Sequence, residues 1–166
     1  MVEIDIDHSL LPSSAMLDSS VLIPALGKKS RATDDPACAQ LFDALIADRR
    51  QILVSTPTVA EILRRAPVSP LPRTRLVRVV SFDLAAAEVL GQRFPPSVLA
   101  KVRDDTGSTL HYIKYDAMIV ACAVRHRAEV LVTTDAKQRK LANSVGLRCA
   151  APSEFAAKQL ALKQIT

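Results

Sequence analysis

Short apolar segments alternate along the chain with longer segments in which apolar residues recur every three or four positions. The apolar segments are rich in Val, Ile and Leu, which predicts buried strands at 15–17, 51–55, 76–82, 129–133 and 147–151. The periodic segments predict helices at 37–47, 83–93, 116–127, 136–144 and 152–164, with a short one before Gly27 and another from Pro57. Residues 94–111 contain two adjacent prolines and a glycine, which predicts an irregular segment.

This alternation of strands and helices predicts an α/β fold: a three-layer α/β/α sandwich around a central, mostly parallel sheet of about five strands. The length of 166 residues fits one domain, which we expect at 15–166, preceded by an N-terminal arm at 1–14. Right-handed crossovers bring the carboxyl ends of parallel strands to one edge of the sheet. Ligands of open α/β sheets bind at that edge.

Composition narrows the class of protein. A hydrophobic fraction of 49% excludes intrinsic disorder. The three cysteines are widely separated and form no C-x-x-C pair, which disfavours a zinc site and suits a reducing compartment. No apolar run reaches the roughly 18 residues that span a bilayer, and the N-terminus lacks a secretory signal. We therefore expect a cytoplasmic protein with no membrane partner.

The net charge of +5 is unevenly distributed. Residues 1–62 carry 5 basic and 9 acidic side chains, whereas residues 63–166 carry 17 and 8. Five arginines and no acid lie between residues 62 and 82. Such a segment is typical either of a solvated surface or of a surface that binds a polyanion.

Four acids lie near the predicted carboxyl ends of the strands: Asp18, Glu61, Asp116 and Asp135. Each has a structural explanation on its own, because the three aspartates stand where helix caps belong and Thr58 to Glu61 has the spacing of a capping box. Together, carboxylates gathered at one edge repel each other unless a cation neutralises them. Mg²⁺ prefers oxygen ligands and leaves coordination positions for a substrate phosphate.

The same acids lie in four short motifs that resemble those of the PIN-domain family. In chain order the motifs are MLDSSVLI (16–23), TPTVAE (56–61), KYDAMIVACA (114–123) and VLVTTD (130–135). Their order and spacing are PIN-like, and the resemblance spans about residues 15–155. It implies an α/β/α nuclease that binds Mg²⁺ or Mn²⁺ and cuts single-stranded or structured RNA to 5′-phosphate and 3′-hydroxyl ends. Many bacterial and archaeal members are VapC-type toxins, which a cognate antitoxin silences and which commonly form homodimers.

The resemblance implies roles for individual residues. The catalytic and metal-binding acids would be Asp18, Glu61, Asp116 and Asp135, supported by the polar residues Ser20 and Thr133. Many toxin members carry a further acid shortly after the fourth motif, whereas residues 136–140 contain none. The expected function is therefore a Mg²⁺- or Mn²⁺-dependent endoribonuclease, with RNA, a possible antitoxin and a second copy of the chain as partners. The cations expected to contact the RNA backbone are Arg64, Arg65, Lys137 and Arg139.

Two other interpretations remain open. A catalytically inactive PIN-fold module for RNA binding or scaffolding would share the fold and the motifs, and a metal-dependent RNase assay separates it from the enzyme. A phosphotransfer protein of the receiver or haloacid-dehalogenase type would need a second acid two residues after Asp18, where Ser20 stands.

Overall fold

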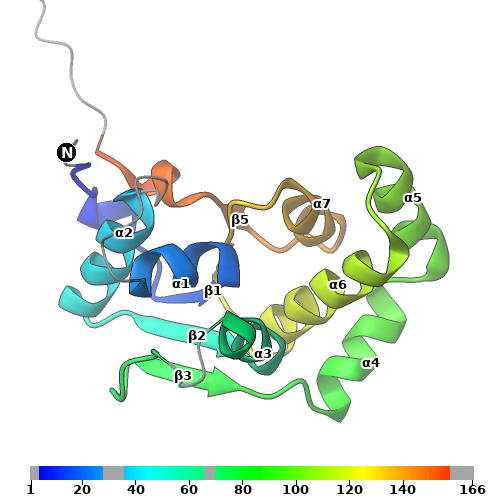
Figure 1. Cartoon of the computed structure of the whole chain (residues 1–166), viewed down its shortest axis with the longest axis horizontal. Helices are drawn as coiled ribbons and strands as arrows, with labels where there is room; N and C mark the ends of the chain where they lie inside the picture. Colours follow the sequence, from blue (N-terminus) through cyan, green and yellow to red (C-terminus); the bar gives the residue numbers. More distant parts are fainter. Residues whose placement is uncertain (1–3, 28–35, 66–69, 158–166) are drawn as a thin grey trace, which may run out of the picture.

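The computed structural model describes residues 4–27, 36–65 and 70–157 and places a five-stranded sheet at its centre (Figure 1). The strands are β1 (Ser14–Leu17), β2 (Gln51–Ser55), β3 (Val77–Val80), β4 (Val130–Val132) and β5 (Cys149–Ala150). They lie in the order β3-β2-β1-β4-β5, and every neighbouring pair is parallel. The predicted α/β class with a parallel sheet of about five strands is confirmed.

Helices cover both faces of this sheet. They are α1 (Ser19–Leu26), α2 (Pro36–Ala47), α3 (Thr56–Arg65), α4 (Leu84–Arg93), α5 (Pro96–Thr106), α6 (Leu110–Arg125) and α7 (Ala136–Ser144). Residues of α1 and α2 pack against one face, and residues of α4, α5, α6 and α7 against the other, while α3 contacts both α1 and α6. The result is the expected three-layer sandwich. Within the described ranges, no helix is both long and apolar enough to cross a membrane.

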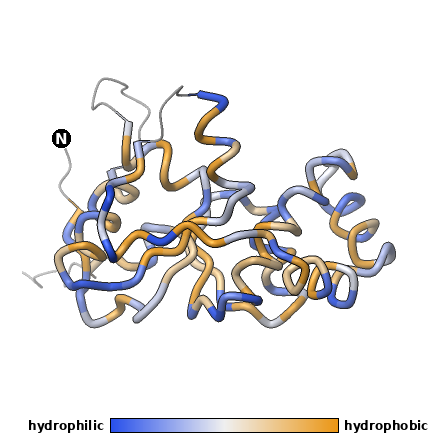
Figure 2. Tube along the Cα trace, turned by 90° about the horizontal axis from the view of Figure 1, so that it is seen from below, coloured by the Kyte–Doolittle hydropathy of each residue, from blue (hydrophilic) through white to orange (hydrophobic). Residues whose placement is uncertain are grey.

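Alternate residues of β1, β2 and β4 point into two separate cores, whereas Arg78 and Val79 of β3 are exposed. In β1, Ala15 and Leu17 belong to the core beside α1 and α2, whereas Met16 belongs to the core beside α4 to α7. All three side chains are fully buried. Figure 2 shows the apolar part of the chain concentrated in the middle of the molecule and hydrophilic segments along its outside. A sheet covered on both faces explains why its strands are continuous apolar runs in the sequence.

The prediction of an irregular segment at 94–111 is wrong. Helix α5 begins at Pro96, where the missing N–H of proline costs nothing, and it ends before Gly107, which adopts a left-handed φ of 65°. Helix α6 then begins at Leu110, six residues before Asp116. The adjacent prolines therefore start a helix instead of preventing one.

The segment before β1 packs against the end of the described chain. Ile6 forms an antiparallel bridge with Ala156, and the N–H of Asp7 donates to the carbonyl of Phe155 at 2.8 Å. Ile6 and Phe155 are both buried in the core beside α2. Most of the expected arm at 1–14 is thus in contact with the domain, and residues 1–3 lie outside the described ranges.

The helix predicted over 152–164 differs in its described part. Only a short 3-10 helix, η2 (Pro152–Phe155), forms there. The extended pairing of Ala156 with Ile6 replaces helical hydrogen bonding at this point. Residues 158–164 of the predicted helix lie outside the described residues.

Candidate functional site

The topology of the sheet brings the first and fourth motifs together. β1 lies in the middle, with β2 and β3 on one side and β4 and β5 on the other. The order of the strands therefore reverses at β1, and ligands of open α/β folds bind at such a reversal. Asp18 directly follows β1, and Asp135 comes shortly after the neighbouring β4.

Asp18 is only 5% exposed, and three donors hold its carboxylate. Its Oδ2 accepts hydrogen bonds from the N–H of Ser20 and from the hydroxyl of Thr133, both at 3.2 Å. Its Oδ1 accepts from Nε2 of Gln138 at 3.4 Å. The bond to Ser20 makes Asp18 the N-cap of α1, and the two side-chain donors fix the orientation of the carboxylate.

Hydroxyl groups link the loop after β1 to the loop after β4. The N–H of Thr134 donates to Oγ of Ser20 at 3.1 Å, and the Ser20 and Thr133 hydroxyl oxygens are 3.2 Å apart. Because the single hydroxyl proton of Thr133 goes to Asp18, Ser20 is the donor to Thr133. The N–H of Asp135 also donates to Thr133, at 3.0 Å. The hydroxyl groups of Ser20 and Thr133 thus fix the positions of Asp18 and Asp135 relative to each other.

Glu61 lies in the second turn of α3 and accepts a hydrogen bond from the hydroxyl of Ser19. The capping-box prediction for Thr58 and Glu61 is wrong. Helix α3 begins at Thr56, and Oγ of Ser55 accepts from the N–H of Thr58 at 3.2 Å. Since Ser55 accepts the hydrogen bond of that N–H, the carboxylate of Glu61 is free to accept from Ser19 in the first turn of α1.

Asp116 lies within α6, so the prediction that it caps a helix is wrong. Its pKa is raised to about 7, chiefly because the side chain is buried and next because of the charge of Asp135. Asp18 and Glu61 raise this pKa further, whereas Lys137 lowers it. The Oδ2 atom of Asp116 is buried without a hydrogen-bond partner. Such a carboxylate costs free energy in the folded protein.

Asp135 combines a structural and an electrostatic role. It caps α7, because its Oδ1 accepts from the N–H of Lys137 at 2.7 Å. Its Oδ2 lies 3.3 Å from Nζ of the same lysine. The ammonium of Lys137 therefore offsets part of the negative charge that surrounds Asp116.

The donor set of the four acids fits a hard divalent cation. It consists of oxygens alone, it is crowded, and it includes the unpartnered Oδ2 of Asp116. As the side chains stand in the described ranges, no group of three Asp, Glu, His or Cys residues is arranged to hold a metal ion. Two of the carboxylates point to local partners instead, Glu61 to Ser19 and Asp135 to Lys137.

The basic residues expected to contact RNA are distributed around these acids. Arg64 and Arg65 are exposed in the last turn of α3. Arg139 pairs with Glu154 at 3.3 Å, and both side chains are substantially exposed. Surface pairs of this kind contribute little stability and exchange partners easily.

Comparison with known families identifies the family of the chain. The sequence model of the family described as PIN domain matches residues 15–144, which is most of the chain. The chain belongs to the PIN-domain family. A search of curated protein sequences finds no match.

Among solved structures, this PIN domain is similar to a chain in the crystal structure of VapBC2 from Rickettsia felis bound to a DNA fragment from their promoter. The TM-score is 0.55 at 17% sequence identity, and the match covers 83% of this chain and 98% of that chain. At such low identity the likeness concerns the fold, which is the expected PIN-like sandwich.

Two side chains of this PIN domain contact the candidate site but were not predicted. Gln138 is 1% exposed, donates to Asp18, and leaves its own Oε1 buried without a partner. The hydroxyl of Tyr115 donates to the carbonyl of Pro57 at 2.6 Å and so joins α6 to α3. Burial, followed by the charge of Glu61, raises the pKa of Tyr115. Tyr115 is adjacent to Asp116 in the third motif, whereas nothing in the sequence distinguishes Gln138 from a surface glutamine.

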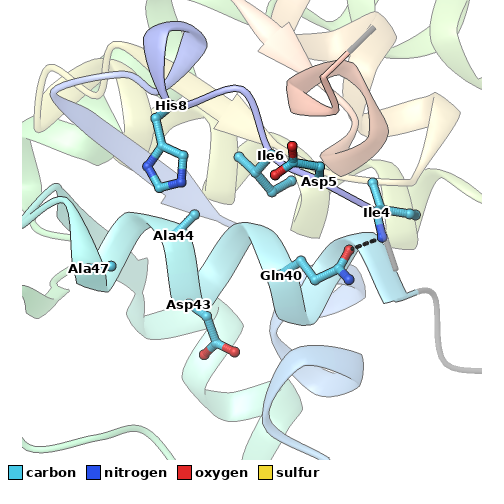
Figure 3. A pocket seen from close by; sticks show the side chains of 8 residues that line it. All are labelled: Ile4, Asp5, Ile6, His8, Gln40, Asp43, Ala44 and Ala47. Carbon is cyan, nitrogen blue, oxygen red and sulfur yellow. Dashed lines mark hydrogen bonds between the residues drawn. The ribbon is translucent and has the colours of Figure 1, made fainter. Parts of the chain in front are cut away.

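A second acidic region of the PIN domain lies between the N-terminal segment and α2 (Figure 3). An open groove of about 600 Å³ is lined there by apolar side chains and by Asp5, His8, Gln40 and Asp43. Gln40 accepts a hydrogen bond from the N–H of Ile4 at 3.1 Å. None of the four candidate acids lines this groove, so it is separate from the candidate site.

Proposed function

We propose that this PIN-domain protein is a Mg²⁺- or Mn²⁺-dependent endoribonuclease that hydrolyses RNA phosphodiester bonds. The observation that carries the proposal is Asp116, a half-buried carboxylate with a buried, unpartnered oxygen and a pKa of about 7 beside three other carboxylates. The repulsion among these carboxylates costs the fold free energy at Asp116, whereas a divalent cation would neutralise it. Membership of a family whose members are generally metal-dependent nucleases supports the same conclusion.

The four acids would hold the cation: Asp18, Glu61, Asp116 and Asp135. Bound Mg²⁺ or Mn²⁺ supplies Lewis-acid chemistry, because it stabilises the negative charge that develops on the phosphate and on the leaving oxygen. Thr133 and Gln138 keep the carboxylate of Asp18 in a fixed orientation. Ligands held in this way by outer hydrogen bonds bind metals more tightly than freely rotating ones.

The exposed cations around the acids would bind the RNA backbone. Arg64 and Arg65 extend from the end of α3, and Lys137 and Arg139 from the first turn of α7. Lys137 and Arg139 form ion pairs at the surface, and a phosphate can replace their carboxylate partners. Binding should weaken as salt concentration rises, since each phosphate contact releases counterions.

We propose further that the protein is the toxin of a type II toxin–antitoxin pair and forms a homodimer. The motifs, together with the fold shared with a chain of the VapBC2 complex, support this assignment. A small DNA-binding protein encoded by the adjacent gene should co-purify with the chain and suppress its RNase activity. Full activity in the presence of that neighbour would contradict the toxin assignment.

An RNase assay tests the enzymatic proposal. We expect cleavage with Mg²⁺ or Mn²⁺, none in excess chelator, and restoration when the metal is added back. Asp18→Asn should abolish cleavage without changing the circular dichroism spectrum. The matched control is Asp104→Asn, because Asp104 is exposed and pairs only with its neighbour Arg103 among the described residues. RNA binding without cleavage under every divalent metal would instead identify the inactive binding module.

A further inference from the structure

Both tyrosines of the chain lie within four residues of Asp116, and they differ in what they do for the fold. The hydroxyl of Tyr115 joins α6 to α3 through Pro57, and its ring is half-buried. The ring of Tyr112 is 64% exposed and meets the ring of His111 edge-on, with 6.1 Å between centroids. Folding therefore gains little from Tyr112, because most of its apolar surface stays in water.

The position of Tyr112 relates it to the candidate site. Tyr112 and Asp116 are four residues apart in α6, so their side chains lie on one face of the helix, with Cβ atoms roughly 5–6 Å apart. The face thus carries an exposed aromatic ring one turn from the carboxylate at the centre of the acidic cluster.

Cations border this face of α6. Helix α7 packs against α6 and carries Lys137, whose charge acts on Asp116. Lys140, one turn further along α7, lies 3.7 Å from Asp105 near the end of α5, directly before α6 begins. Figure 1 shows α5 and the start of α6 beside α7, at the end of the molecule opposite α2. Lys137 therefore lies beside Asp116, one helical turn from the exposed ring, and Lys140 follows it along α7.

We propose that Tyr112 is a binding surface for an unpaired RNA base, on which the base next to the cleaved phosphate stacks. Proteins that bind single strands combine cations along the backbone with aromatic rings under the bases. In a duplex the bases are already stacked on each other and cannot reach a side chain of this kind. The inference rests on the proposed nuclease function and specifies how that same site holds its substrate.

Fluorescence provides a direct test, because the chain contains no tryptophan. Tyr112→Trp in the full chain introduces a single fluorophore that can still stack. The probe is a short single-stranded RNA, added with Ca²⁺ in place of Mg²⁺ so that the carboxylates remain neutralised. We expect the RNA to quench the tryptophan emission, and a strand of equal length without bases to leave it unchanged.

Leu84→Trp is the matched control. Leu84 is 78% exposed in the first turn of α4. The start of α4 lies beside the last residue of α6, because Asp83 forms an ion pair with Arg125. This position is remote along α6 from Tyr112, so the same RNA should not quench a tryptophan placed there. Equal quenching at both positions would show non-specific association and would overturn the inference.

Affinity measurements separate stacking from charge. Tyr112→Ala should weaken binding of the single strand about ten-fold, while Tyr112→Phe should keep the wild-type affinity, since stacking needs the ring and not the hydroxyl. Neither variant should alter the slope of log affinity against log salt concentration. Arg64→Ala should reduce that slope by about one phosphate contact, because it removes a charge.

Three further results would overturn the inference, and they differ in what they mean for the proposed function. Wild-type cleavage and binding of RNA with no effect of any Tyr112 variant would remove the stacking role alone. Emission that depends on protein concentration and not on RNA would show that a second copy covers the ring. Failure of the wild-type protein to bind or cleave any RNA would remove both the stacking role and the nuclease.

Discussion

The aspartate side chains of the two acidic regions of this PIN domain differ in their exposure to water and in their hydrogen-bond partners. In the groove beside α2, Asp5 and Asp43 are exposed, and His8 pairs with Asp48, just outside the groove, at 2.9 Å. At the carboxyl edge of the sheet, Asp18 is buried and Asp116 keeps an unpartnered oxygen and a pKa of about 7. Water solvates the acids of the groove, whereas the acids of the edge are crowded where the topology of the sheet concentrates them.

The two groups of acids therefore differ in their effect on the free energy of folding. A solvated carboxylate has almost no effect on stability, and a surface ion pair contributes at most about 1 kcal/mol. A buried carboxylate among others of the same charge destabilises the folded state unless something binds it. Replacement of the groove acids should therefore leave function and stability unchanged, whereas replacement of Asp116 should lower RNase activity and raise stability.

The largest expected effect is on RNA cleavage. Glu61→Gln keeps the size of the side chain but removes a negative charge from the cluster, so cleavage should fall roughly 10²–10³-fold. Asp43→Asn makes the same chemical change in the groove and should leave the rate unchanged. Initial rates at saturating Mg²⁺ measure both. Equal losses in the two variants would remove the distinction between the regions.

The next largest effect is on the free energy of unfolding, and it depends on pH. Between the ordinary Asp pKa of 3.8 and the raised value of about 7, the folded protein binds more protons at Asp116 than the unfolded chain does. This contribution therefore makes the protein less stable as pH rises through the interval. Asp116→Asn removes it, so without metal the variant should be about 2 kcal/mol more stable than wild type near pH 8.

Urea unfolding at several pH values, with chelator present, measures this difference. Below about pH 3 the two proteins should have nearly the same free energy of unfolding, because Asp116 is then mostly protonated in both states. An Asp116→Asn variant that is less stable than wild type at pH 8 would show that this carboxylate stabilises the fold.

The smallest effect concerns one glutamine in each region. Gln138→Leu removes a donor from buried Asp18 and should lower Mg²⁺ affinity several-fold, with a change of about 1 kcal/mol in stability. Gln40→Leu removes the partner of the half-buried Ile4 N–H and should lower stability by about 1 kcal/mol while leaving Mg²⁺ affinity unchanged. Loss of metal affinity in Gln40→Leu would connect the two regions.

Most of the fold could be predicted because strands buried on both faces are long apolar runs in any context. Helix α5 could not, since Pro95-Pro96 indicates a break, and only its place in the structure shows that Pro96 begins a helix capped by Gly107. The same error placed Asp116 at a helix start. The extra turn from Leu110 mixes polar and apolar residues, so its periodicity is weak.

The four acids could be proposed from their motifs, but their partners could not. The bond from Gln138 to Asp18 joins residues 120 positions apart, and the bond from Ser19 to Glu61 joins residues 42 positions apart. No local pattern encodes such pairs. The spacing of Thr58 and Glu61 predicts a cap at Thr58, whereas Ser55, the last residue of β2, accepts the hydrogen bond from the Thr58 N–H.

Calorimetric titration with Mn²⁺ tests the central claim most directly, namely that the edge acids form a cation site. Near pH 7, where Asp116 is about half protonated, binding to wild type should release protons, which repeats in buffers of different ionisation heat will detect. We predict the same affinity and proton release in Asp43→Asn, and in Asp116→Asn an affinity at least about ten-fold weaker with no proton release. Unchanged Mn²⁺ binding in Asp116→Asn would contradict the account.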